Sequence, residues 1–262
     1  MLFFADLHIH SKYSRGSSSN MEPHVLRSFA RVKGLNLLGT GDFSHPKWLT
    51  ELKDKLEAVG DTGFYTLREG GSDVFFVLTN EVSTSFESEG ETKNVHHLLL
   101  VESFEVVDQV NEIIAKYGNL DADGRPMLGC TPAELVELLL QVDRNILVVP
   151  AHLWTSWFGA LGERGFNSLE ECYGDMVDHI HAVETGLSSD PPMNWRLSSL
   201  DRYVLLSNSD SHSPWPWRLG REANVFNLDE PSFRDLVDAV KKKDKRRIVM
   251  TIEVAPEYGI PQ

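Results

Sequence analysis

The sequence predicts a single-domain α/β protein, with a distorted TIM-like barrel of about seven β/α units as the preferred architecture. Two observations lead to this fold class. Short apolar, β-rich runs alternate with helical patterns along all 262 residues, and no linker, long repeat or low-complexity tract divides the chain. Such alternation implies parallel strands joined by right-handed crossovers. An open doubly wound sheet is the alternative, and in both architectures ligands collect where the strands end.

The first part of the chain contains strands and helices in alternating order. Strands are expected at residues 2–7, 35–42, 74–82 and 94–101. Helices are expected at residues 22–34, 46–59 and 104–118, the last of them amphipathic at helical spacing. Pro23 lies in the first turn of the first helix and Gly34 at its end, which are the positions that these residues favour.

The second part continues the same pattern. Thr131, Pro132 and Glu134 are the signature of a capped helix start, so a helix is expected over 131–141. Strands are expected at 145–152, 179–186 and 202–210. A helix from Pro231 and a strand at 247–254 complete the predicted elements.

Composition narrows the class of protein. Apolar residues make up 41% and charged residues 24%, as in soluble globular proteins. No apolar run approaches the ~20 residues of a membrane span, and the N-terminus lacks the features of a signal peptide, so we expect a cytoplasmic protein without membrane contact. Cys130 and Cys172 lack metal-binding spacing and are interpreted as reduced thiols. The net charge of −14 argues against tight nonspecific binding of nucleic acid.

The predicted strands end in side chains that bind metals. These residues are Asp6, His8, His10, Asp42, His45, Glu81, His96, His97, His152, Glu184, Asp210 and His212. If all the strands run the same way, their carboxyl ends share one rim and the side chains converge there. A single histidine of this kind is more often a packing or surface residue, but seven such strand ends are hard to explain by packing because buried unpaired polar groups are costly.

The ligand types indicate the metals. Imidazole with carboxylate suits zinc, manganese or iron more than magnesium, which is kept as a candidate. About eight ligands exceed the capacity of one ion, and Glu81 could bridge two ions. The sequence therefore predicts two or three divalent metal ions and no organic cofactor.

Several motifs are familiar as a set. The segments "DLHIH", "TGDFSH", "VHHL", "PAH" and "SDSH" resemble the PHP (polymerase and histidinol phosphatase) family. Longer stretches, among them "ADLHIHSKYSR", "LSNSDSHS" and "LGREANVF", are most similar to its endonuclease Q branch. The resemblance implies a distorted seven-stranded barrel with a three-metal site. It also implies that residues 1–262 are the PHP domain without the zinc-binding and helical module that follows in that branch.

The resemblance also implies how the ligands are shared. His8, His10 and Asp210 would hold the first metal, and Glu81 would bridge it to a second metal held by His152 and one histidine of the "VHHL" pair. His96 is preferred from that pair, with His97 as the alternative. Asp42 and His212 would hold the third metal, which His45 could join. Two departures weaken this third site, because Arg15 or Gly16 replaces a usual acid or histidine and Asp42 replaces a histidine.

The function that follows is hydrolysis of a phosphodiester by water activated at a divalent ion. By resemblance, the leading hypothesis is a DNA repair endonuclease that nicks on the 5′ side of uracil, hypoxanthine, xanthine or an abasic site. A small-molecule phosphomonoesterase of the histidinol phosphatase type is the alternative, which the acidic composition favours. An inactive PHP scaffold is a second alternative.

The remaining candidates would act on the substrate or behind the ligands. Arg15, Arg196, Arg218 and Arg221 are candidate phosphate-binding residues, with Arg15 preferred and Arg125 as a further possibility. Trp154 and Trp157 could stack on an extruded base or form a packed rim, as could Trp215 and Trp217. Glu184 and Asp6 are expected to orient ligands or water from behind.

Overall fold

The computed structural model describes residues 1–69, 71, 73–88, 90–255 and 257. Its strands form one ten-stranded mixed sheet and one separate two-stranded sheet. The large sheet contains β1 (Leu2–Asp6), β2 (Leu37–Gly39), β3 (Leu56–Ala58), β4 (Tyr65–Leu67), β5 (Phe75–Ser88), β6 (Glu91–Val101), β7 (Met127–Leu128), β8 (Leu147–Pro150), β11 (Ala223–Asn227) and β12 (Ile248–Ile252). The small sheet pairs β9 (Ala182–Glu184) with β10 (Val204–Leu206).

The centre of the large sheet is parallel, as predicted. β1 pairs with β2, and β2 with β5, in parallel register, and β9 and β10 are also parallel. The expectation that all the ligand-bearing strands run the same way is wrong for β6, which is antiparallel to both β5 and β8. Only residues 89–90 separate β5 from β6. So short a connection allows a hairpin and excludes the crossover that a parallel pair needs.

The helices start and end largely where the sequence indicates. They are α1 (Pro23–Lys33), α2 (Pro46–Lys55), α3 (Phe104–Ile114), α4 (Pro132–Val142), α5 (Leu169–Tyr173), α6 (Pro191–Asn194) and α7 (Phe233–Lys241), with 3₁₀ turns η1 (Gly174–His179) and η2 (Ser198–Leu200). Gly34 ends α1 with a φ of 88°, a conformation that glycine adopts without strain. Thr131 and Glu134 form the predicted capping box of α4.

One helix is shorter than predicted, and several short elements were not predicted, among them β4, α5, α6 and both 3₁₀ turns. The helix expected over 46–59 ends at Lys55, because residues 56–58 form β3 and pair with β4. The short strand β7 and the strand β11 were not predicted either. β11 pairs antiparallel with β1 and carries β12 at its other edge, so the large sheet continues beyond β1.

The closed barrel is not confirmed, because β8 and β9 belong to different sheets. The strands nevertheless surround one core, to which β1, β2, β5, β6, β8, β9 and β10 contribute Ala5, Leu37, Val77, Leu98, Val149, Ala182 and Leu206. A bridge between Ile9 and Ser211 also joins the segments that follow β1 and β10. The ends of these strands therefore lie close together even though hydrogen bonding does not close the ring.

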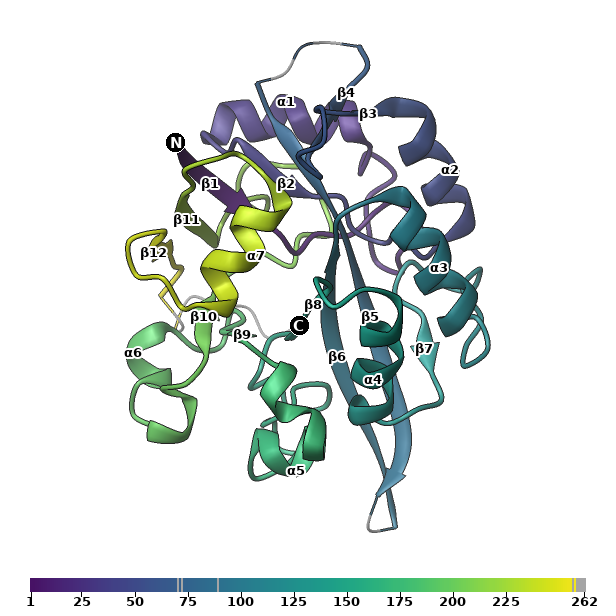
Figure 1. Ribbon diagram of the computed structural model, residues 1–262, viewed down its shortest axis with the longest axis vertical. Coiled ribbons are helices and arrows are strands. Elements are labelled where there is room, and N and C mark those ends of the chain that lie inside the picture. The colour runs from purple at the N-terminus through teal and green to yellow at the C-terminus, as the bar shows by residue number, and fades with distance from the viewer. Residues whose placement is uncertain (70, 72, 89, 256, 258–262) are drawn as a thin grey trace.

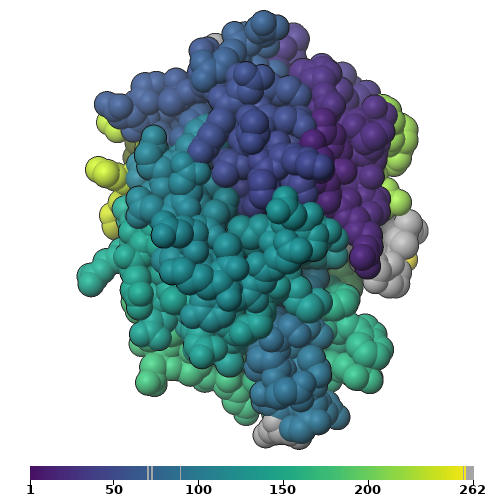
Figure 2. Space-filling view, turned by 90° about the vertical axis from the view of Figure 1, so that its right-hand side faces the viewer, coloured from purple at the N-terminus to yellow at the C-terminus, as the bar shows by residue number. Residues whose placement is uncertain are grey.

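Helices α1 to α4 cover the strands from outside, whereas the buried face of α7 belongs to the core that the strands surround. Figure 1 shows α1 to α4 along the outer side of β1, β2, β5 and β6, while α7 lies over β1 and β11. Figure 2 shows the outer face, where α2, α3 and α4 form a continuous surface and the β5–β6 hairpin reaches beyond them at the lower end. Cys130 and Cys172 are buried free thiols, as predicted. Among the described residues, no helix combines the length and the apolar character that crossing a membrane requires.

Candidate metal centre

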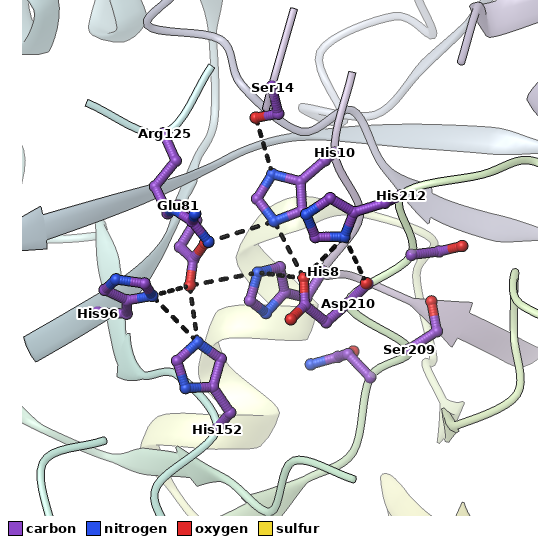
Figure 3. Close-up of polar contacts among 12 residues, drawn as sticks. His8, His10, Ser14, Glu81, His96, Arg125, His152, Ser209, Asp210 and His212 are labelled. Carbon is purple, nitrogen blue, oxygen red and sulfur yellow. Dashed lines mark hydrogen bonds and ion pairs between the residues drawn. The ribbon is translucent and has the colours of Figure 1, made fainter. Parts of the chain in front are cut away.

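Six buried side chains from five strand regions converge at one end of the strands (Figure 3). They form two groups of three, in each of which the donor atoms lie within 4.8 Å of one another. The first group follows β1 and β10 and contains His8, His10 and Asp210; the second comes from β5, β6 and the end of β8 and contains Glu81, His96 and His152.

Glu81 joins the two groups because each of its oxygens faces one of them. Oε1 lies 2.9 Å from Nδ1 of His96 and 2.9 Å from Nε2 of His152. Oε2 lies 3.3 Å from Nε2 of His10. In the first group, Nε2 of His10 is also 3.0 Å from Oδ1 of Asp210. The two groups are therefore one continuous cluster with a shared carboxylate.

The donor atoms of this cluster fit divalent ions. Nε2 of His8, Nε2 of His10 and both carboxylate oxygens of Asp210 are buried, and although they lie close to one another none of them makes a hydrogen bond. Buried polar atoms are nearly always paired, and leaving them unpaired is costly. Imidazole nitrogens and carboxylate oxygens so close together are the ligand set of zinc, manganese and iron sites. The residue types of the cluster therefore fit divalent metal ions.

Charge within the cluster sets the protonation states of its members. Burial alone would raise the pKa of Glu81 and Asp210, but the neighbouring histidines, and Arg125 at Glu81, hold both well below their ordinary values. Burial alone would lower the pKa of His8 and His10, but the surrounding carboxylates raise both well above the usual value. Burial lowers the pKa of His96 to about 4. The carboxylates are thus ionised and ready to bind a cation, which displaces protons from His8 and His10.

Two further carboxylates orient the histidines from behind. Glu184 accepts a hydrogen bond from Nδ1 of His8, with both oxygens 3.0 Å away. Asp42 lies 3.0 Å from Nδ1 of His10 through Oδ1, while its Oδ2 accepts a hydrogen bond from the backbone N–H of Ser11 at 2.5 Å. Both contacts leave Nε2 of each ring to face the cluster, which is how metal-binding histidines are usually held.

The backbone is strained at three residues of this region. Asp42, His152 and Asp210 have φ values of 51°, 31° and 47°, in the left-handed region that residues with a side chain rarely adopt. Such strain persists only where the surrounding structure enforces it, and it is concentrated at functional sites. Its occurrence at two cluster members and at the residue behind His10 supports a functional role.

A cavity of about 590 Å³ opens over the cluster. Its lining includes His96, His152, Asp210, His212 and four arginines, Arg15, Arg125, Arg218 and Arg221. A second cavity of about 390 Å³ adjoins it, shares His152 and Asp210, and is lined by Trp154, Trp157, Glu184 and Asn208. Ligands in either cavity would reach the cluster, the first against cationic side chains and the second against aromatic rings.

The chain was compared with protein families, with known sequences and with solved structures. No family model matches the chain. An uncharacterized protein of Methanocaldococcus jannaschii is 37% identical over 180 residues, which make up 68% of this chain and 20% of that protein. The crystal structure of the lesion-specific endonuclease PfuEndoQ from Pyrococcus furiosus has a TM-score of 0.87 at 34% identity and covers 99% of this chain and 60% of that one.

A second solved structure extends this result. Endonuclease Q in complex with a 27-mer duplex, with an abasic lesion at its active site, has a TM-score of 0.85 at 34% identity and covers 98% of this chain. The chain is a PHP-type domain similar to endonuclease Q. It spans 60% of both endonuclease Q chains and 20% of the M. jannaschii protein.

In this PHP-type domain, the histidine pair of β6 is divided between two environments. His96 faces Glu81 and His152, as preferred from the sequence. Nε2 of His97 lies 3.0 Å from the hydroxyl of Thr84, and its Nδ1 lies 3.0 Å from that of Tyr173. Both nitrogens of His97 are therefore used in packing, away from the cluster.

The residues predicted for a third metal are not gathered into a third group among the described residues. Asp42 uses its oxygens on His10 and Ser11, as described above. Nδ1 of His212 lies 3.0 Å from the backbone carbonyl of Asp210, and its ring packs on that of His10 at 4.3 Å. His45 stacks on Tyr13 with ring centroids 4.5 Å apart.

The residues predicted to act from behind also differ in position. Glu184 contacts His8, as expected, whereas the carboxylate of Asp6 accepts hydrogen bonds from Ser209 and the backbone of Gly220. Burial raises the pKa of Asp6 to about 6 in spite of these bonds. Asp6 therefore holds the loop that carries Asp210, and it does so without touching a histidine nitrogen.

The predicted arginines and tryptophans are only partly at the cavities. Arg15 and Arg218 line the larger cavity, while the guanidinium of Arg221, also there, donates to the carbonyl of Ser209. Arg196 is exposed and lines neither cavity. The indole N–H of Trp154 donates to Asn194 at 2.8 Å, and Trp157 packs under the guanidinium of Arg164, 3.9 Å from the ring centre.

Two residues of the site were missed from the sequence. Ser14 lies 3.1 Å from Nδ1 of His10, and Asn208 donates to Oε1 of Glu184 at 2.8 Å. Asn208 also accepts a hydrogen bond from the backbone N–H of Leu7 at 2.9 Å, so it ties β10 to the segment with the two histidines. Neither residue type indicates metal chemistry, and only proximity to a predicted ligand could have identified them.

Proposed function

We propose that this chain is a metal-dependent phosphodiester hydrolase acting on DNA, which nicks 5′ of deaminated bases (uracil, hypoxanthine or xanthine) or of abasic sites. The observation that carries the proposal is the carboxylate of Glu81, shared by two buried ligand groups beneath a cavity lined with arginines. The similarity to endonuclease Q, one structure of which holds a DNA duplex with an abasic lesion at its active site, supports DNA as the substrate.

The proposed cofactors are two or three divalent ions, chosen from zinc, manganese, iron and magnesium. When bound, such ions lower the pKa of water and neutralise phosphate oxygens, which supplies a nucleophile without a protein side chain. His8, His10 and Asp210 would hold one ion and Glu81, His96 and His152 another. We also propose that the two sheets and their common core correspond to the distorted seven-stranded barrel of the PHP family.

The protein's own side chains would bind and position the substrate. Arg15 and Arg218 at the larger cavity can hold the phosphate, because a guanidinium matches phosphate oxygens with paired hydrogen bonds. Trp154 and Trp157 line the adjoining cavity, where their rings can stack on a base that leaves the duplex. Because the chain has a net charge of −14, attraction to DNA would have to come from the arginines around the larger cavity.

A small-molecule phosphomonoesterase is the second candidate function. The same net charge of −14 favours it, because an acidic surface repels the many phosphates of a nucleic acid. An inactive scaffold is disfavoured, since buried polar atoms that make no hydrogen bond, such as Nε2 of His8 and His10 and the oxygens of Asp210, are costly to keep without a ligand.

The test is incubation of the protein with Mn²⁺ or Mg²⁺ and end-labelled duplexes that carry one uracil, hypoxanthine or abasic site. An undamaged duplex and p-nitrophenyl phosphate serve as comparison substrates. Nicking restricted to the lesion strand, abolished by a chelator and by Asp210→Asn, would support the proposal. Turnover of the monoester alone would overturn it in favour of the phosphatase, and no turnover of any substrate by metal-loaded protein would favour the scaffold.

A further inference from the structure

One guanidinium reaches the shared carboxylate of the cluster. Nη1 of Arg125 lies 3.2 Å from Oε2 of Glu81, the same oxygen that faces Nε2 of His10 (Figure 3). The Arg125 side chain is 28% exposed and lines the larger cavity together with His96 and Asp210. Arg125 therefore contacts the bridging carboxylate and faces the space where a substrate would lie.

The loop that carries Arg125 is pinned against the cluster. The backbone N–H of Gly124 donates to the carbonyl of Tyr13 at 3.1 Å, and that of Arg125 donates to Asp123 at 3.1 Å. On the far side, the carbonyl of Pro126 accepts a hydrogen bond from the N–H of Ser83 at 2.9 Å. Contacts on both sides of Arg125 thus fix its backbone, so its position at Glu81 is built into the fold.

Of the two residues predicted to hold a third ion, Asp42 is committed elsewhere, because its two oxygens contact His10 and Ser11. His212 uses Nδ1 on a backbone carbonyl, which leaves its Nε2 without a carboxylate partner from Asp42 for a third ion. The described side chains accordingly form two ligand groups. Arg125, from another part of the chain, instead brings a positive charge to the bridging carboxylate.

The charges around the cluster explain how a guanidinium at Glu81 would favour binding of a phosphate. Four carboxylates contact the histidines of the cluster, namely Asp42, Glu81, Glu184 and Asp210. Two divalent ions would neutralise these four negative charges, and the guanidinium of Arg125 would then add a positive charge beside the other three arginines that line the cavity. A phosphodiester group carries one negative charge, and opposite charges a few ångströms apart attract strongly where water is partly excluded.

We propose that Arg125 takes the place of a third metal ion: the centre binds two divalent ions, and the guanidinium bridges Glu81 and the substrate phosphate. The inference rests on the proposed hydrolytic function and names a substrate-binding residue of the same site. The pKa of Arg125 is raised, first by the charge of Glu81, so its positive charge is secure at any pH at which the protein works. Guanidinium offers five N–H donors, enough to contact the carboxylate and a phosphate together.

The first measurement is metal stoichiometry, by elemental analysis of Mn²⁺-saturated protein after removal of free metal. We expect two ions per chain in the wild type and two in Arg125→Gln. Three ions in the wild type would overturn the proposal. Loss of ions in Arg125→Gln would also overturn it, because Arg125 would then serve only to hold Glu81 in place.

The second measurement is the affinity of the Mn²⁺-loaded protein for inorganic phosphate, by calorimetry. We expect Arg125→Gln to weaken it about tenfold or more, because the phosphate loses a charged hydrogen-bond donor. Arg125→Lys should recover part of the loss, and Arg196→Gln, whose side chain lies outside both cavities, should change nothing. Equal affinity in Arg125→Gln and wild type, or no binding by the wild type, would overturn the proposal.

Circular dichroism and thermal melting of each variant establish that the fold is retained. Neither stoichiometry nor phosphate affinity depends on which ester the protein cleaves. The protein could fail to nick DNA although it binds two ions and although Arg125→Gln weakens phosphate binding. That result would refute the proposed substrate and would leave the role of Arg125 unchanged.

Discussion

Both carboxylate oxygens of Glu184 lie 3.0 Å from Nδ1 of His8. The carboxylate therefore accepts a hydrogen bond from Nδ1–H and leaves Nε2 facing Glu81 and Asp210, each 3.7 Å away. Glu184 is itself held by Asn208 and by the backbone N–H of His152. One carboxylate thus orients a ligand from each of the two groups, although it belongs to neither.

This contact predicts the effect of Glu184→Gln on metal binding. The amide keeps the size of the side chain but removes the charge that favours Nδ1–H on His8. We expect Mn²⁺ affinity, measured by calorimetry, to fall about 10- to 100-fold, as at other sites where the group behind a ligand is changed. Glu137→Gln, on the exposed side of α4, is the matched control. Unchanged affinity in Glu184→Gln would contradict the assigned role.

His96 and His97 are neighbours in sequence, and we expect opposite consequences when each is replaced. His96→Ala removes a donor from the group with Glu81 and His152, so bound Mn²⁺ should fall by about one ion per chain while the protein stays folded. His97→Leu should retain the metal. It should lower the free energy of unfolding by about 1–3 kcal/mol, because Thr84 and Tyr173 lose a buried hydrogen-bond partner.

These two variants are compared by elemental analysis and by urea unfolding. Burial lowers the pKa of His97 to about 3, so the wild-type ring is neutral and no charge is lost in the substitution. Metal loss in His97→Leu without loss of stability would show that the assignment of the pair is reversed.

Gly124 is expected to tolerate no side chain. A Cβ atom there would lie 2.3 Å from Oδ2 of Asp42 and 2.4 Å from the hydroxyl of Ser14, both of which contact His10. Gly124→Ala should therefore cost about 1–3 kcal/mol of stability by overpacking and reduce hydrolysis through the displaced histidine. Gly129→Ala, whose Cβ would meet only the carbonyl of Tyr117 at 3.6 Å, should change neither. Urea unfolding and steady-state rates distinguish the two variants, and equal behaviour would refute the prediction.

Glu222 predicts a pH dependence of stability. Both of its oxygens are buried without a partner, and burial, with the charges of Glu253 and Glu184, raises its pKa to about 9 from an ordinary value of 4.5. Between these two values the unfolded chain releases a proton that the folded protein retains, so Glu222 lowers stability increasingly as the pH rises. Glu222→Gln cannot ionise and should remove this penalty.

We therefore expect the gain in the free energy of unfolding on Glu222→Gln, measured without metal, to depend on pH. The gain should be larger near pH 8 than near pH 5 by at least about 1 kcal/mol, since one pKa unit corresponds to about 1.4 kcal/mol. Urea unfolding in the presence of a chelator measures this difference. Glu137→Gln should show no such trend. A difference between Glu222→Gln and wild type that is flat with pH would mean that Glu222 is ionised in the folded protein.

Much of the local structure could be predicted because its causes are local. Pro23 and Gly34 mark the limits of α1, and Thr131 with Glu134 marks the start of α4, through contacts made within a few residues. The direction of β6 was predicted wrongly because an alternating pattern of apolar runs does not distinguish a hairpin from a crossover. The predicted strands ended at 82 and began again at 94, and only their extension to Ser88 and from Glu91 in the structure leaves the two-residue connection of a hairpin.

The sequence by itself determined the ligand types and most of the elements that carry them, because apolar periodicity and residue chemistry are properties of short segments. Only the tertiary structure decided that His96 rather than His97 faces the cluster, that Asp42 lies behind His10, and that Arg125 reaches Glu81. Each of these outcomes depends on which segments, up to dozens of residues apart, share a buried volume. Packing and charge pairing between distant segments set that volume, and no short stretch of sequence encodes them.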